Sequence, residues 1–202
     1  MPHPQHTITT VILAGGAARR MGGEDKGLTL LGGEAMIAHV IRRIAGQTST
    51  LLINCNRSQQ QYARFGYPLI EDTIVGGLGP LAGLLSALEQ SNSDFVLSVP
   101  CDTPLLPIDL IERMVEAIEQ QGAQACTVSD GERLHPVVLL VRRSLLTGLR
   151  DYLTAGGRKV HDWFYSIPHC SADFSDQPQA FVNINTPQQL EMLQQRLQQD
   201  EQ

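Results

Sequence analysis

Continuous apolar runs alternate with helical patterns along most of the chain, and this alternation restricts the fold more than any other feature. The runs at 8–13, 50–54 and 95–99 have the length of strands, whereas 34–47 carries apolar residues at helical spacing. Because the runs lack regular polar alternation, both faces of these strands are expected to be covered, as in a parallel sheet. The pattern predicts an α/β fold with a mostly parallel sheet between layers of helices.

The remaining segments fit the same order of strands and helices. Further strands are expected at 68–71, 123–128, 136–141 and 180–182, and further helices at 58–65, 81–89, 108–120, 144–154, 160–165 and from Pro187 onward. Thr186 is expected to cap the last helix together with Gln189, three residues later. No repeat or long linker divides the 202 residues, so we predict one domain, 1–202, built as a Rossmann-like three-layer sandwich.

Composition excludes several classes of function. The net charge of −6 argues against a broad nucleic-acid-binding surface, although a few local cations can still bind a small anion. No apolar run approaches the ~20 residues of a membrane span, and the N-terminus lacks the pattern of a signal peptide. The four cysteines are widely spaced, which favours a reducing, cytoplasmic location. Cys101, next to Asp102, is interpreted as a small buried residue in preference to a catalytic thiol.

Four connections follow predicted strands at the edge where open α/β sheets bind ligands, namely 14–26, 54–57, 72–80 and 100–107. The first connection is rich in glycine and cations, but it matches neither of two common phosphate-binding loops. Gly15 and Gly16 are adjacent, and the second strand ends in Asn54 where a dinucleotide fingerprint needs an acid. Lys26 is followed by Gly27, which excludes a Walker A loop.

The chemistry of this connection still favours a polyphosphate. Glycines allow close approach of backbone N–H groups to a phosphate, and Arg20 and Lys26 supply positive charge against a triphosphate. A plain wide turn with solvated cations is the alternative. Asp102 directly follows a buried strand and could hold Mg²⁺ against phosphate oxygens, because Mg²⁺ often takes a single protein carboxylate. A turn or capping role for Asp102 is the alternative.

Three further positions carry polar side chains near predicted strand ends. Asp72 could contact a base edge, bind the water shell of a metal, or cap a turn. Asn183 and Asn185 alternate around Ile184 at the end of the predicted strand 180–182, where they are possible acceptor-binding residues or simply turn-forming asparagines.

Four motifs together resemble a known family. LAGGAARRMGGEDK is similar to the signature loop of nucleotidyltransferases that activate a phosphorylated acceptor with a nucleoside triphosphate. With IEDTIVGGLGPLAG, PCDTPLLP and FVNINTPQQL in the same order, the chain resembles the molybdenum cofactor guanylyltransferase family from Val11 to Leu190. The resemblance implies a fold of the nucleotide-diphospho-sugar transferase type.

The resemblance also implies an activity and a set of contacts. It implies transfer of GMP from GTP to the terminal phosphate of Mo-molybdopterin with release of pyrophosphate. It also implies, as partners, molybdopterin-synthesis and molybdoenzyme-maturation proteins that deliver or collect the pterin. It assigns Mg²⁺ binding to Asp102 and places Asn54 and Asp72 near the guanine nucleotide. Main-chain contacts to the base are expected from Leu13, Ala14 and Gly15, and charge neutralisation from Arg20, Lys26 and Asp102.

Two rival functions remain open from the sequence. A sister enzyme would use CTP on the same acceptor or act on another small phosphorylated acceptor, and spacing alone does not distinguish guanine from cytosine. A non-catalytic molybdopterin carrier is a rival of another class, which the presence of Lys26 and Asp102 argues against.

Overall fold

The computed structural model describes residues 6–14, 25–74, 76 and 79–200. Within these residues, seven strands form a central sheet in the order β5-β4-β1-β6-β8-β7-β9. Their bounds are β1 Ile8–Leu13, β4 Thr50–Asn54, β5 Leu69–Ile70, β6 Phe95–Pro100, β7 Ala125–Ser129, β8 Leu134–Arg142 and β9 His169–Asp173. Strand β8 runs antiparallel to both of its neighbours, and every other pairing is parallel. The predicted mostly parallel sheet is therefore confirmed.

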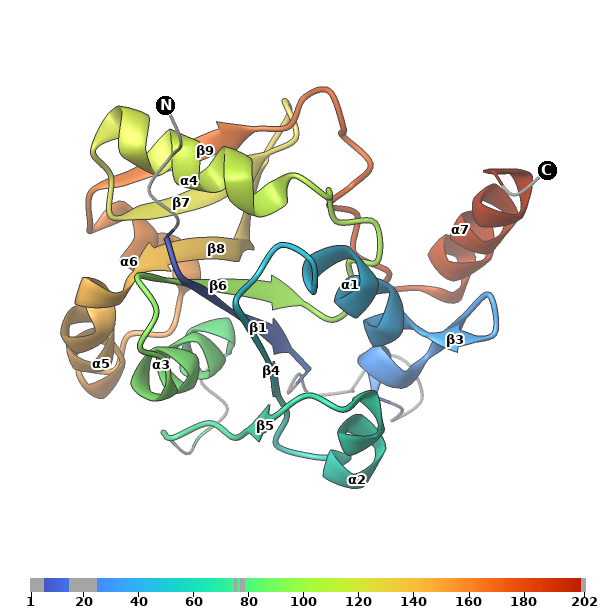
Figure 1. The fold of residues 1–202 in the computed structure, drawn as a ribbon, viewed down its shortest axis with the longest axis horizontal. Helices are drawn as coiled ribbons and strands as arrows, with labels where there is room; N and C mark the ends of the chain where they lie inside the picture. The colour runs from blue at the N-terminus through green and yellow to red at the C-terminus, as the bar shows by residue number, and fades with distance from the viewer. Residues whose placement is uncertain (1–5, 15–24, 75, 77–78, 201–202) are drawn as a thin grey trace.

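Helices cover both faces of this sheet (Figure 1). Their bounds are α1 Met36–Ile44, α2 Gln59–Tyr62, α3 Pro80–Gln90, α4 Leu110–Gln121, α5 Leu146–Thr154, α6 Val160–Tyr165 and α7 Pro187–Asp200. Short 3-10 turns lie at Lys26–Leu28 (η1), Ala63–Phe65 (η2) and Arg143–Leu145 (η3). Helices α1 and α4 pack on one face, and α3, α5 and α6 pack on the other. The result is the predicted sandwich of helix, sheet and helix.

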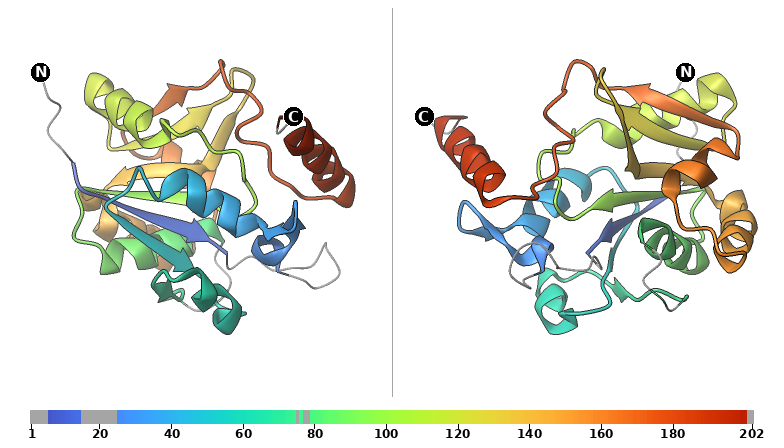
Figure 2. Two further views of the ribbon diagram at one scale, coloured as in Figure 1. Left: turned by 45° about the vertical axis from the view of Figure 1, so that its right-hand side comes forward. Right: turned by 180° about the vertical axis from the view of Figure 1, so that it is seen from behind.

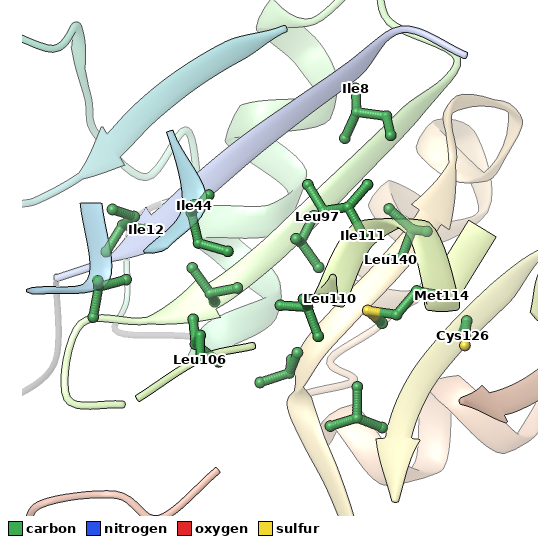
Figure 3. Close-up of a cluster of buried hydrophobic side chains, with 14 of the residues drawn as sticks. Ile8, Ile12, Ile44, Leu97, Leu106, Leu110, Ile111, Met114, Cys126 and Leu140 are labelled. Carbon is green, nitrogen blue, oxygen red and sulfur yellow. The ribbon is translucent and has the colours of Figure 1, made fainter. Parts of the chain in front are cut away.

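Alternating side chains of the central strands separate two hydrophobic cores. Ile12 and Leu97 face α1 and α4, whereas Val11 and Val96 face α3 and α5. Figure 3 shows the first core, where Ile44 of α1 and Met114 of α4 lie over the sheet. Both faces of β1 and β6 are buried, which explains why the corresponding sequence runs are apolar throughout. Among the described residues, no helix has the length and apolar character needed to cross a bilayer.

In the central sheet, one predicted strand is wrong and one observed strand was not predicted. Residues 180–182 form turns and extended chain, and the last strand of the sheet is instead β9, whose Cys170 pairs with Cys126 of β7. Phe181 is buried because it packs against Phe174 and the ring of His135. Its apolar character therefore reflects side-chain packing from a loop.

Helix α7 begins with the predicted capping box. The N–H of Gln189 donates to Thr186 Oγ1 at 3.2 Å, and Gln189 Oε1 accepts the N–H of Thr186 at 3.1 Å. Figure 2 shows α7 at the periphery, beside the hairpin of β2 (Leu30–Leu31) and β3 (Glu34–Ala35). The buried Leu193 joins the base of α7 to this hairpin.

A buried carboxylate with several hydrogen bonds stabilises the turn between β7 and β8. Asp130 accepts the N–H groups of Glu132 and Arg133 at 2.9 and 2.8 Å, and its other oxygen lies 2.6 Å from His135 Nε2. Burial alone would raise the pKa of Asp130, but the hydrogen bonds from Arg133, His135 and Glu132 together outweigh it. The pKa of Asp130 therefore lies well below its usual value.

This depressed pKa predicts an acid-dependent loss of stability. The carboxylate of Asp130 contributes fully above its unfolded-state pKa of about 4, and the contribution disappears as the pH falls below that value. We expect Asp130→Asn to lower the free energy of unfolding by roughly 1–2 kcal/mol at pH 7, and the gap to wild type should narrow between pH 4 and pH 2.5. Urea unfolding across this pH range measures the gap, and a gap that stays constant would contradict the assignment.

Candidate functional site

The carboxyl ends of three parallel strands bring the predicted ligand-binding loops to one edge of the sheet. Leu13, the last residue of β1, is in register with Asn54 of β4 on one side and with Pro100 of β6 on the other. The register continues beyond the strands, because Ala14 N–H donates to the Asn54 carbonyl at 2.8 Å and Cys101 N–H donates to the Leu13 carbonyl at 3.2 Å. The connections after β1, β4 and β6 therefore start side by side.

Lys26, Asp102 and Asn185 meet at this edge. Lys26 opens the 3-10 turn η1, and its ammonium nitrogen lies 3.2 Å from Asp102 Oδ2. The same ammonium also donates to Asn185 Oδ1. The side chain of Asp102 is only 11% exposed, and that of Lys26 is 27% exposed. A partly buried cation and a nearly buried carboxylate thus share one location, as the sequence predicts for a phosphate site.

The segment that carries Asn183 and Asn185 lies along the Asp102 loop. The N–H of Ile184 donates to the Asp102 carbonyl at 3.0 Å, and the hydroxyl of Thr103 donates to Asn183 Oδ1 at 3.1 Å. Ile184 is buried between the two asparagines. The predicted alternation around Ile184 is therefore present, although this segment is an extended loop after β9 and not the end of a strand.

A second polar group lies at the ends of β4 and β5. Asn54 Nδ2 donates to Asp72 Oδ1 at 3.0 Å, and Asn56 Nδ2 donates to Asp72 Oδ2 at 2.8 Å. Asn56 also accepts the N–H of Asp72 at 2.9 Å, so the two residues form a cyclic pair of hydrogen bonds. Asn54 is 3% exposed. The structure therefore brings Asn54 and Asp72 together and holds the Asp72 carboxylate in a fixed orientation.

Helix α3 presses against this polar group through a glycine. A Cβ on Gly83 would lie 2.5 Å from Asn54 Oδ1 and 2.6 Å from Leu13 Cδ2. Only a residue without a side chain allows α3 to approach Asn54 this closely. Gly83 thereby limits the positions open to the Asn54 carboxamide.

Two cysteines next to the site are protonated packing residues. Burial raises the pKa of Cys101 far above its usual value, and the neighbouring carboxylates of Asp102 and Asp25 raise it further. Burial likewise raises the pKa of Cys55 to about 11. Both thiols are free and buried. Cys101 therefore has the packing role that the sequence favours and does not supply a reactive thiolate.

Two predicted site residues, Gly15 and Arg20, lie outside the described residues. Other residues of the site were not predicted from sequence, namely Asp25, Asn56, Tyr62, Gly83 and Thr103. Asn56 lies in the connection 54–57, which follows a predicted strand at the ligand-binding edge, so its polar side chain was a usable signal. Tyr62 gave none, because it lies in a short helix whose other residues are exposed.

The fold is that of solved nucleotidyltransferases. The chain superposes on molybdopterin-guanine dinucleotide biosynthesis protein A from Archaeoglobus fulgidus with a TM-score of 0.78, 20% identity and coverage of 95% of this chain and 99% of that one. It also superposes on 4-diphosphocytidyl-2C-methyl-D-erythritol synthase from Anaerococcus prevotii with a TM-score of 0.73, 10% identity and 96% coverage of each chain. The architecture is thus that of a nucleotidyltransferase of the nucleotide-diphospho-sugar transferase type.

Sequence similarity then gives the family. Residues 10–170 match the model of the MobA-like NTP transferase domain. A protein from Shewanella sp. (strain W3-18-1) named molybdenum cofactor guanylyltransferase is 53% identical over 186 residues, which cover 92% of this chain and 95% of that protein. The chain belongs to the MobA-like NTP transferase family, and the resemblance deduced from the four motifs is confirmed.

Proposed function

We propose that this protein is a guanylyltransferase that transfers GMP from GTP to the terminal phosphate of Mo-molybdopterin. An oxygen of the acceptor phosphate would attack the α-phosphorus of GTP, the bond between the α-phosphorus and the bridging oxygen would break, and pyrophosphate would leave. The observation that carries the proposal is the Lys26, Asp102 and Asn185 cluster in a chain that is 53% identical to a protein named for this activity.

Lys26 and Asn185 would contribute charge and orientation. The ammonium of Lys26 is held at the ends of β1 and β6 by a carboxylate and an amide oxygen, so its position does not depend on substrate. A preorganised cation stabilises charge that develops on phosphate oxygens without reorganising during the reaction. Arg20, which belongs to the same sequence loop, is proposed to add a second positive charge.

Asp102 is proposed to hold Mg²⁺. The donor set suits this ion, because Mg²⁺ prefers oxygen ligands and often takes one carboxylate together with substrate phosphates. Asp102 Oδ2 contacts Lys26, and the amide oxygens of Asn183 and Asn185 belong to the adjoining segment. When bound, Mg²⁺ would neutralise phosphate charge and polarise the phosphorus–oxygen bonds. Asp102 would thus keep the bound Mg²⁺ close to the ammonium of Lys26.

The reaction should need no general base from the protein. The second pKa of a phosphate monoester is about 6, so the acceptor phosphate is largely deprotonated near neutral pH. Among the described residues, no histidine forms a hydrogen bond or ion pair with Lys26, Asp102 or Asn185. Asn183 and Asn185 come from the C-terminal part of the sequence, and we propose that they contact the molybdopterin acceptor.

The base is proposed to lie near Leu13, Ala14, Asn54 and Asp72, with Gly15 adding a main-chain contact. The fixed carboxylate of Asp72 is a hydrogen-bond acceptor suited to the N–H edge of guanine.

Purified protein should therefore release pyrophosphate with GTP, Mg²⁺ and Mo-molybdopterin and should form the guanine dinucleotide, as measured by chromatography of the product. Turnover with CTP but not with GTP would replace this proposal by the cytidylyltransferase alternative.

The carrier alternative predicts a different result from the same assay. A protein that only binds and delivers molybdopterin would release no pyrophosphate with either nucleotide, and Asp102→Ala would leave its function unchanged.

We further propose that the enzyme acts in the cytoplasm and passes its product to molybdoenzyme-maturation proteins. The handoff is an expectation of the family resemblance, and the location is inferred from the N-terminal sequence and the spacing of the cysteines.

The close approach of Gly83 to Asn54 predicts a loss of nucleotide binding on Gly83→Ala. The new methyl group would displace the Asn54 carboxamide, which we propose contacts GTP, and would cost about 1–3 kcal/mol through overpacking. We expect KM for GTP to rise about tenfold, with little change in KM for the acceptor. Steady-state kinetics with each substrate varied in turn measures both constants.

Gly148→Ala is the matched control for this prediction. Gly148 lies in α5, and apart from the adjoining backbone of the helix no described atom lies within 4 Å of the position that a Cβ would take. The change should stabilise the protein by up to about 1 kcal/mol through helix propensity and leave both KM values unchanged. Equal kinetic effects of the two substitutions would contradict a specific role for Gly83.

A further inference from the structure

The turn that carries Lys26 is anchored by a buried tyrosine. Tyr62, the last residue of α2, is fully buried, and its hydroxyl donates to Asp25 Oδ1 at 2.5 Å. Asp25 directly precedes Lys26, and its carbonyl accepts the N–H of Leu28 at 2.9 Å, which closes the 3-10 turn η1. The Tyr62 hydroxyl therefore holds the residue from which this turn starts.

A second contact connects the same turn to the Asp102 loop. A Cβ on Gly27 would lie 2.7 Å from Tyr62 Oη and 3.2 Å from both Cβ and Sγ of Cys101. Gly27 thus lies between Tyr62 and Cys101, and Cys101 is the neighbour of Asp102 in the chain. The turn is therefore packed against Tyr62 and against the residue at which the Asp102 loop begins.

Tyr62 is the buried residue of a helix, α2, whose other residues are exposed. The three preceding residues, Gln59, Gln60 and Gln61, are all exposed, so Tyr62 is the residue through which α2 enters the core. Burial raises the pKa of Tyr62 far above its usual value, and Cys101 and Asp25 raise it further. The phenol is therefore always protonated and always able to donate to the Asp25 carboxylate.

We propose that Tyr62 is a positioning residue for the transfer reaction, which acts by fixing Asp25 and thereby the turn from which Lys26 reaches Asp102 and Asn185. Among the described residues, Tyr62 forms no hydrogen bond with Lys26 or Asp102: its hydroxyl donates to Asp25, one residue before Lys26. The inference rests on the proposed function, because the hydrogen bond between Tyr62 and Asp25 affects turnover only if Lys26 takes part in GMP transfer.

The first test removes the hydroxyl in the full-length protein. We expect Tyr62→Phe to lower kcat/KM for GTP about tenfold, because the carboxylate loses a charged hydrogen bond and Lys26 loses its fixed position. Tyr152→Phe is the matched control: it also removes one hydroxyl hydrogen bond, to the Lys159 carbonyl at 3.1 Å, and should leave kcat/KM unchanged. An unchanged kcat/KM in Tyr62→Phe would overturn the proposal.

The second test asks whether Tyr62 acts through Lys26. In a Lys26→Ala background, adding Tyr62→Phe should produce no further loss of residual turnover, because the group being positioned is already absent. If the tenfold loss appears again in this background, Tyr62 acts by a general structural route and the proposal is wrong.

The third test separates the hydrogen bond from the charge of Asp25. Asp25→Asn keeps an oxygen that accepts from Tyr62 and should retain at least about half of the turnover, whereas Asp25→Leu should match Tyr62→Phe. Equal damage from both Asp25 substitutions would overturn the positioning role.

A readout that does not depend on activity separates failure of this inference from failure of the proposed function. Amide hydrogen exchange at Leu28 reports the closure of η1, and we expect it to be about tenfold faster in Tyr62→Phe than in wild type or Tyr152→Phe. If wild type transfers no GMP but the Leu28 exchange still accelerates, the proposed function fails while the anchoring of the turn stands. Unchanged exchange overturns the anchoring itself.

Discussion

Asp102→Asn is expected to lower kcat for GMP transfer about 1000-fold, the largest effect of any single substitution considered for this site. The change preserves shape and removes the negative charge at a side chain that is 11% exposed. We propose that this charge holds Mg²⁺ and orients Lys26, and an amide performs neither task well. Pyrophosphate release at saturating GTP, Mg²⁺ and Mo-molybdopterin measures the loss.

A control variant and a Mg²⁺ titration test whether the loss in Asp102→Asn comes from its missing charge. Asp151→Asn removes the same charge from an exposed position of α5 and should leave kcat unchanged. A Mg²⁺ titration of Asp102→Asn should show a higher Mg²⁺ requirement than wild type, because the proposed ligand is missing. Wild-type turnover in Asp102→Asn would remove Asp102 from the mechanism.

Lys26→Ala is expected to lower kcat/KM for GTP about 100- to 1000-fold. Its ammonium is held by Asp102 and Asn185, so deletion removes a preorganised cation and also leaves the Asp102 carboxylate without its partner. Both consequences weaken the stabilisation of phosphate charge in the transition state. Kinetics at varied GTP concentration separates the loss in kcat from any rise in KM.

Lys159→Ala is the natural control, because Lys159 is the other lysine of the chain and its side chain is 79% exposed. It should behave as wild type. Lys26→Arg should recover only part of the activity, since a planar guanidinium cannot reproduce the two contacts of a compact ammonium. Full activity in Lys26→Ala would contradict the phosphate-binding role.

The sequence predicts the layered fold well because buried parallel strands leave a strong apolar signal. The strand predicted at 50–54 matches β4 to the residue, and the helix predicted at 160–165 matches α6. Strand β9 was missed because it lies at one edge of the sheet, where exposed polar residues alternate with small buried ones. The predicted helix 34–47 starts late, at Met36, because Glu34 and Ala35 pair with β2 across Gly32 and Gly33, which both have positive φ.

Some contacts of the proposed site could also be predicted from sequence, whereas others could not. Parallel topology alone brings the ends of β1, β4 and β6 to one edge, so Asn54 and Asp102 could be placed there from sequence. The contact between Lys26 and Asn185 depends on the path of the loop after β9, which no local pattern encodes. The hydrogen bond from Tyr62 to Asp25 also joins residues with no periodic relation. Such contacts depend on tertiary packing and therefore lie beyond sequence patterns.

The contact between Lys26 and Asn185 joins residues that are 159 positions apart in the chain. During translation, Asn185 is added roughly 8–30 s after Lys26 at ordinary rates of chain growth. Most of the central sheet can form in that interval, but the ammonium of Lys26 has no amide partner until the final stretch of the chain has been made. A growing chain released between the end of β9 and Asn185 would contain every strand of the central sheet but would lack the contact on which we propose that turnover depends.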